Sequence, residues 1–93
     1  MEYKNFGNVL VARIDKGEEI VEAIKKICTK EKISLGKVNA IGAVNKAKIG
    51  LFETGKKKYH STVLTGDFEI TSLSGTVTAM GNEPYLHLHI SLA

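Results

Sequence analysis

The stretch Tyr85-Leu86-His87-Leu88-His89-Ile90-Ser91-Leu92-Ala93 says most about how this chain folds and where its chemistry lies. Apolar and polar residues alternate along it, as they do in a β-strand with one buried and one exposed face. His87 and His89 therefore share the polar face, with their Cβ atoms roughly 6 to 7 Å apart. A divalent metal between them could bond both imidazoles at about 2.0–2.1 Å. The pattern predicts a metal site at His87 and His89.

Zinc is the expected ion, because imidazoles with one open position form a common zinc arrangement, and nickel, iron or copper accept the same ligands. Two histidines do not hold a metal alone, so a third ligand is required. His60 is a less favoured source of it. Glu69 is a candidate for orienting one imidazole through a hydrogen bond to the other ring nitrogen. The competing interpretations are a metal-free histidine pair on an exposed strand, and a Glu69 that is simply solvated.

The rest of the chain predicts one α+β domain over residues 1–93. From Glu18 to about Lys32 apolar residues recur at spacings of three and four, which is typical of an amphipathic helix, and Asp15 is the expected N-cap. Most of the remainder is apolar, β-branched and punctuated by glycine. We expect an antiparallel-rich sheet of about six short strands, with the single helix packed on one face.

The charge of the chain is unevenly distributed. The net charge is +3, but residues 25–58 hold ten lysines and two glutamates, a local balance of +8. Arg13 is the only arginine, and base-specific reading of DNA leans on arginine pairing with guanine. Non-specific attraction of phosphates by lysines is the remaining route to nucleic acid. Lys56, Lys57 and Lys58 form a basic turn that predicts an anion or nucleic-acid contact, with a solvated hairpin tip as the other interpretation.

Several other functions find little support. No apolar run approaches the roughly 20 residues of a membrane helix, and the single Cys28, on the helix stripe, fits a buried thiol in a reducing, cytoplasmic compartment. No phosphate-binding glycine motif or nucleophile elbow is present, so an enzyme is the less favoured class. Phe52, Phe68 and Tyr85 could stack on bases, but core packing is the favoured role.

Two motifs carry a family resemblance. Gly66-Asp67-Phe68-Glu69-Ile70-Thr71-Ser72-Leu73-Ser74-Gly75-Thr76, with the pattern FE-x-x-SLSG, precedes the His-Leu-His strand. Together with Phe6-Gly7 and Ile41-Gly42-Ala43-Val44, they resemble the plants-and-prokaryotes-conserved (PPC) domain family. This domain follows the AT-hooks of plant AT-hook nuclear-localised proteins and stands alone in prokaryotes. The resemblance covers nearly the whole chain.

The resemblance implies an α+β fold, a homotrimer and the label "DNA-binding", which belongs more firmly to the AT-hooks. This chain has no Gly-Arg-Pro core and therefore no AT-hook. In prokaryotic relatives a later Gly-Gly-His segment adds a third histidine to the His-x-His pair, and we expect this chain to lack that segment and the last strand.

Three hypotheses follow, in order of preference. The first is a trimeric assembly or regulatory module with weak DNA association. The second is a small metalloprotein, which could be enzymatic, built on the two histidines. The third is direct DNA binding through residues 25–58. The sequence identifies no small-molecule ligand.

Overall fold

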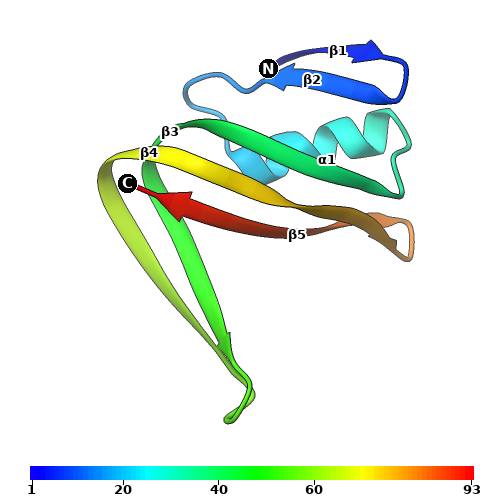
Figure 1. The fold of residues 1–93 in the computed structure, drawn as a ribbon. Coiled ribbons are helices and arrows are strands. Elements are labelled where there is room, and N and C mark those ends of the chain that lie inside the picture. The colour runs from blue at the N-terminus through cyan, green and yellow to red at the C-terminus, as the bar shows by residue number, and fades with distance from the viewer. The chain divides into compact units, whose positions relative to one another are not determined.

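The computed structural model describes residues 1–93. In chain order its elements are β1 (Glu2–Phe6), β2 (Val9–Arg13), α1 (Ile20–Lys30), β3 (Gly36–Glu53), β4 (Lys58–Met80) and β5 (Glu83–Leu92) (Figure 1). Strands β1 and β2 form one sheet, and β3, β4 and β5, in that order, form a second. The chain divides into two compact units, residues 1–36 with 77–86 and residues 37–76 with 87–93. The α+β class with one helix is confirmed.

The expected count of about six strands is wrong, because the structure has five. Segments that read as separate strands are continuous: β3 has 18 residues and β4 has 23. Gly42, which was expected to mark a bend or bulge, and Gly66, which was expected in a turn, both lie inside continuous strands, with φ of +155° and +131°. Glycine reaches such angles without a Cβ clash, so it bends a strand that continues on both sides.

The amphipathic helix is confirmed, and its cap is corrected. Glu19, rather than Asp15, is the N-cap, and its side chain accepts a hydrogen bond of 2.6 Å from the Glu22 backbone N–H. Asp15 lies in the turn before the helix, where its carbonyl accepts from the Glu18 N–H at 3.1 Å. The predicted apolar stripe includes the buried residues Ala23, Ile27 and Cys28.

The C-terminal end of α1 closes through a left-handed residue. Lys32 has φ of +56°, and the Ile33 N–H beyond it donates to the Cys28 carbonyl at 2.8 Å. This six-to-one bond is the mark of a Schellman motif, a position that glycine normally fills. With 11 residues, α1 is too short to cross a membrane.

In the unit of residues 37–76 and 87–93, the buried core comes from β4. Ile70 and Leu73 are both buried although they lie three positions apart in the sequence, which breaks the period of two. Thr71 and Ser72 between them are exposed. This change of face within a continuous strand indicates a β-bulge, where one extra residue shifts the alternation.

Candidate functional site

Strand β5 presents its two histidines on one exposed face. Its burial alternates strictly from Glu83 to Leu92, and His87, His89 and Ser91 all fall on the exposed side. The two imidazole ring centroids lie 5.2 Å apart with their planes inclined by 31°. The period of two therefore predicts correctly that the rings are neighbours. Both are open to a ligand from solvent.

The C-terminal half of β5 is held to β4 by backbone bonds. Glu69 and Ala93 exchange two hydrogen bonds of 2.9 Å, each N–H donating to the other's carbonyl. Two residues further along, the Thr71 hydroxyl donates to the Ser91 carbonyl at 3.0 Å. These bonds fix the strand, and so the direction of its exposed face, independently of any ligand.

The structure brings no third candidate ligand to the histidine pair. No group of three histidine, cysteine, aspartate or glutamate side chains is arranged to hold a metal ion. Glu69 forms its hydrogen bonds to Ala93 through the backbone, and its exposed side chain accepts no hydrogen bond from His87 or His89. The donor chemistry of the pair fits zinc or a related ion, but the pair needs at least one ligand from elsewhere.

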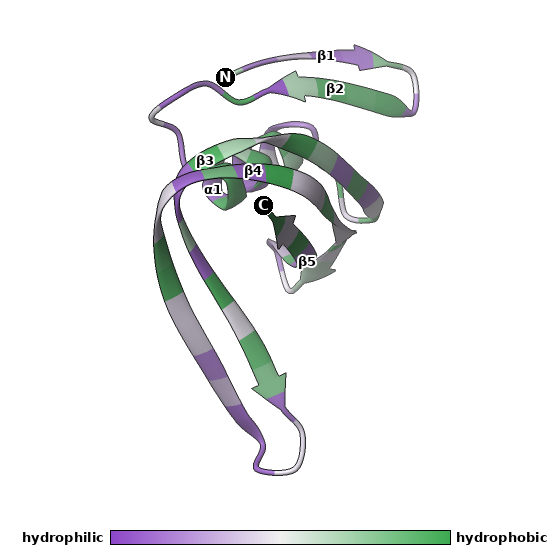
Figure 2. Cartoon of the chain, turned by 60° about the vertical axis from the view of Figure 1, so that its left-hand side comes forward, coloured by the Kyte–Doolittle hydropathy of each residue, from purple (hydrophilic) through white to green (hydrophobic).

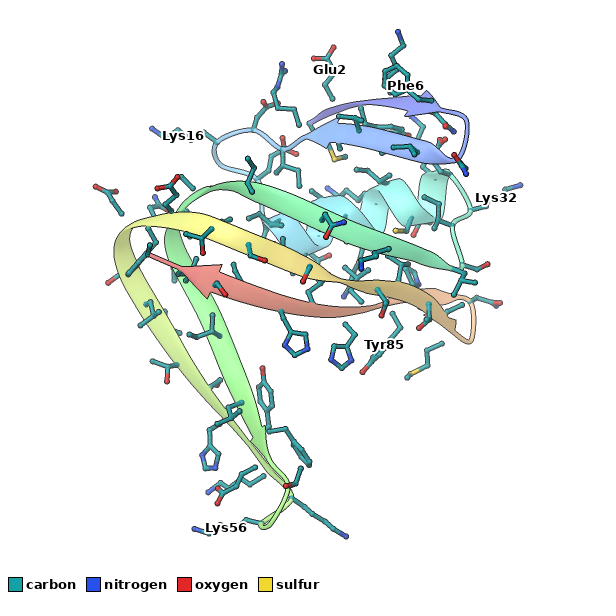
Figure 3. The ribbon with its side chains drawn as sticks, in the orientation of Figure 1. Glu2, Phe6, Lys16, Lys32, Lys56 and Tyr85 are labelled. Atoms are coloured by element: carbon teal, nitrogen blue, oxygen red, sulfur yellow. The ribbon has the colours of Figure 1, made fainter.

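His60 does not join the other two histidines. Its Nε2 lies 2.8 Å from a carboxylate oxygen of Glu53 across the β3–β4 hairpin, and both side chains are exposed. The turn of this hairpin carries Lys56 and Lys57, and Lys58 begins β4; all three are exposed, and Lys57 adopts φ of +51°. Lys56 lies at the very end of the hairpin (Figure 3). The predicted basic turn is therefore a solvent-facing tip.

The lysines of α1 are partly balanced by acids. An open groove in the unit of residues 1–36 and 77–86 is lined by both signs of charge, and Lys25 lies 3.8 Å from the Glu22 carboxylate. Its lining residues are Glu22, Lys25, Lys26, Thr29, Lys30, Glu83 and Pro84. The local excess of lysines predicted by the sequence is thus concentrated on the hairpin rather than on the helix.

A family model of the Plants and Prokaryotes Conserved (PCC) domain, the family abbreviated PPC above, matches residues 1–93. The chain belongs to the PPC domain family. No curated protein sequence matches it.

Solved structures of similar proteins have the same fold. A protein from Bacteroides thetaiotaomicron, described with a proposed role in DNA binding, has 33% identity and a TM-score of 0.94, with 98% of this chain and 64% of that chain covered. A PPC protein from Pyrococcus horikoshii has 41% identity and a TM-score of 0.78, with 85% and 55% covered. A metal-containing protein from Archaeoglobus fulgidus has 34% identity and a TM-score of 0.86, with 98% and 64% covered. The chain thus spans less than two thirds of the length of each.

In this PPC domain the two sequence motifs meet at one contact. Gly75, which ends the FE-x-x-SLSG pattern in β4, lies against the backbone of the His-Leu-His pattern in β5. A Cβ atom at Gly75 would lie 2.8 Å from the Leu88 Cα and closer still to the His87 carbonyl oxygen. Real Cβ atoms do not approach backbone so closely, so this position accepts only glycine without a shift. The glycine lets the histidine strand approach β4.

Exposed aromatic residues of this PPC domain were missed. Core packing was expected for Phe52 and Tyr85, but they are 53% and 46% exposed, and Tyr59 is 63% exposed. For Phe52 and Tyr59 the sequence does hold a signal, because both residues lie close to the lysine turn. The end of a hairpin is far along the chain from the buried residues of β4. An apolar run alone does not distinguish a covered aromatic ring from an open one.

Proposed function

We propose that this chain is a self-associating PPC module, trimeric and with an assembly or regulatory role, that associates weakly with DNA without an AT-hook. The observation that carries the proposal is the balance of apolar residues. Six residues are buried, all of them hydrophobic, whereas twelve large hydrophobic residues are exposed. Ile41 and Leu51 are 83% and 71% exposed. A soluble monomer rarely leaves so much apolar surface uncovered, which favours association with further copies.

The proposed number of copies comes from the family likeness, which implies a homotrimer. Multi-angle light scattering on a concentration series tests it, because a trimer would have about three times the 10.1 kDa chain mass. A constant mass near 10.1 kDa at micromolar concentration would remove the assembly part of the proposal.

Weak DNA association is supported by the charge and by the proposed role of the Bacteroides relative. The only arginine, Arg13, is engaged by Glu2 at 3.0 Å and by Asp15 at 2.8 Å. It is therefore poorly placed to pair with guanine, and phosphate contacts by lysine remain. Such binding falls steeply with added salt. No retention of the protein on DNA at low salt would contradict this part.

A cytoplasmic location is part of the same proposal. Cys28 is unpaired and buried, as expected for a protein of a reducing compartment.

A second candidate function is a metal centre on β5. It is favoured by the ring spacing of 5.2 Å between His87 and His89 and by the Archaeoglobus relative described as metal-containing. We infer that these imidazoles supply two ligands and that a further ligand comes from another copy or from chain that follows Ala93, such as a Gly-Gly-His segment. When bound, zinc could polarise a water molecule.

Metal analysis of the purified protein beside His87→Ala tests the second candidate. Asn39→Ala, a substitution at an exposed residue of another strand, is the matched control. The proposal expects metal in the wild type and the control, and its loss in His87→Ala. Equal, negligible metal in all three proteins would contradict it.

A further inference from the structure

The β3–β4 hairpin ends in a two-stranded ribbon. Strand β4 lies between β3 and β5, and β5 reaches it as far as the Glu69–Ala93 backbone pair. Before Glu69, β4 has β3 as its strand neighbour, and the two continue together to the turn (Figure 1). We call residues 44–65 the ribbon arm. Figure 2 shows hydrophobic and hydrophilic residues interspersed along it.

Two contacts identify the faces of the ribbon arm. The Tyr59 ring lies over Gly50, since a Cβ atom at Gly50 would meet the Tyr59 Cε1 at 2.5 Å and its hydroxyl end closer still. His60 and Glu53 are bonded at 2.8 Å and therefore share the other face. Because side chains alternate along a strand, residues two positions apart lie on the same face. Each residue of the two strands can therefore be assigned to the face of Tyr59 or to the face of His60. The face of Tyr59, which we call the aromatic face, carries Lys46, Lys48, Gly50, Phe52, Tyr59, Ser61 and Val63.

The charge on the aromatic face and the tip is entirely positive. Lys46 and Lys48 are exposed on this face, and Lys56 and Lys57 are exposed in the turn. The one acid of the arm, Glu53, lies on the opposite face, where His60 engages it. Lysines along a ribbon without intervening acids are suited to follow a phosphate backbone.

The aromatic face also offers two rings. Phe52 and Tyr59 are both more than half exposed, and the absence of a side chain at Gly50 lets the Tyr59 ring lie across the strand. Exposed rings beside lysines are the usual platform for single-stranded nucleic acid, because every base has a π-face on which to stack. Bases in a duplex present only their edges, and the arm has no arginine to read them.

We propose that the aromatic face of the ribbon arm binds single-stranded DNA, with bases stacked on Phe52 and Tyr59 and phosphates on Lys46, Lys48 and the tip. This inference rests on the proposed DNA association and locates its contact. It also specifies the strand form: a single strand is preferred over a duplex. The α1 groove, with its mixed charges, is not the contact.

Fluorescence anisotropy with a labelled oligothymidine of about 16 nucleotides tests the inference, with a duplex of the same length as the competitor. Phe52→Leu with Tyr59→Leu removes both rings and keeps apolar side chains. We expect it to weaken single-strand binding at least about 10-fold and leave the salt dependence unchanged. Lys46→Gln with Lys48→Gln should reduce the slope of log affinity against log salt by about 1.4, because each phosphate contact on a single strand contributes about 0.7.

The matched control carries the same loss of charge on α1. Lys26→Gln with Lys30→Gln removes two exposed lysines of the other unit. At low salt this variant should bind the single strand, and the slope of its log affinity against log salt should equal that of the wild type. All substituted side chains are exposed, and circular dichroism checks that each variant keeps the wild-type spectrum.

The outcomes separate this inference from the function on which it rests. No binding by the wild type at low salt would remove both. Wild-type binding that the arm variants retain and the α1 variant loses would overturn the inference and leave DNA association standing. Equal or tighter binding of the duplex would overturn the single-strand preference. Arm variants with unchanged affinity but a lower molar mass would show that the arm joins copies of this chain instead.

Discussion

Replacing Gly75 by alanine is expected to separate the histidine strand from its neighbour. The new Cβ would lie 2.8 Å from the Leu88 Cα, at least 0.6 Å inside the 3.4 Å at which ordinary van der Waals contact begins. The His87 carbonyl oxygen would be closer still. Because these are backbone atoms, no side-chain rotation relieves the overlap, and β5 has to move.

The magnitude follows from two opposing effects. Alanine restricts the unfolded chain more than glycine does, which favours the variant by about 0.5–1 kcal/mol. Overpacking against rigid neighbours costs about 1–3 kcal/mol, and each β4–β5 ladder hydrogen bond that is lost adds about 1 kcal/mol. The clash therefore outweighs the gain, and we expect the free energy of unfolding to fall by about 2–3 kcal/mol.

Urea unfolding followed by far-ultraviolet circular dichroism measures this, since the chain has no tryptophan for fluorescence. Protein concentration is held constant, because association of copies would shift the midpoint. Gly50→Ala is the matched control: the three atoms nearest to its Cβ all belong to the side chain of Tyr59, which is exposed and can rotate away. It should change stability by less than about 0.5 kcal/mol. Equal midpoints for the Gly75 variant and the wild type would refute the reasoning.

Three further predictions concern stability and titration. Lys32→Gly should raise the free energy of unfolding by about 0.5–1 kcal/mol, because glycine adopts the left-handed conformation at the end of α1 without a Cβ penalty; a lower urea midpoint would contradict it. Tyr3→Phe removes the 3.1 Å hydrogen bond to the Glu31 carboxylate and should lower stability by about 0.5–1.5 kcal/mol, whereas an unchanged midpoint would show that the bond contributes nothing. Burial raises the pKa of the Cys28 thiol, so the folded state holds this proton more tightly than the unfolded chain does. Stability should therefore fall as pH rises past the ordinary thiol pKa of about 8.5, and Cys28→Ala should flatten that fall in urea unfolding measured from pH 7 to 10; identical profiles would count against the prediction.

The elements with a regular period could be predicted from the sequence. The stripe through Ala23, Ile27 and Cys28 indicates α1, and the alternation around His87 and His89 indicates β5, because each depends on local spacing alone. The strand count failed because glycine has more than one role. Gly75 ends the SLSG pattern inside a continuous strand, where it permits close approach of backbone, and sequence alone does not separate that role from a turn.

The remaining errors concern contacts between distant residues. The pairing of His60 with Glu53 depends on the register of the β3–β4 hairpin, which the turn sequence did not reveal. Glu69 is opposite Ala93, a pairing that depends on the register of β4 and β5, which the sequence did not reveal. Exposure of Phe52 and Tyr59 depends on what covers the hairpin, and an apolar run carries no information about that.

Sedimentation velocity of a fluorescently labelled single-stranded oligonucleotide with the wild-type protein tests the central claim most directly. It measures the mass of the protein and its association with DNA in one experiment. At about 50 mM salt we expect a protein boundary of about three times 10.1 kDa with the label sedimenting alongside it, and at about 300 mM the label released. A boundary at 10.1 kDa, with the label sedimenting alone at the lower salt, would contradict the account.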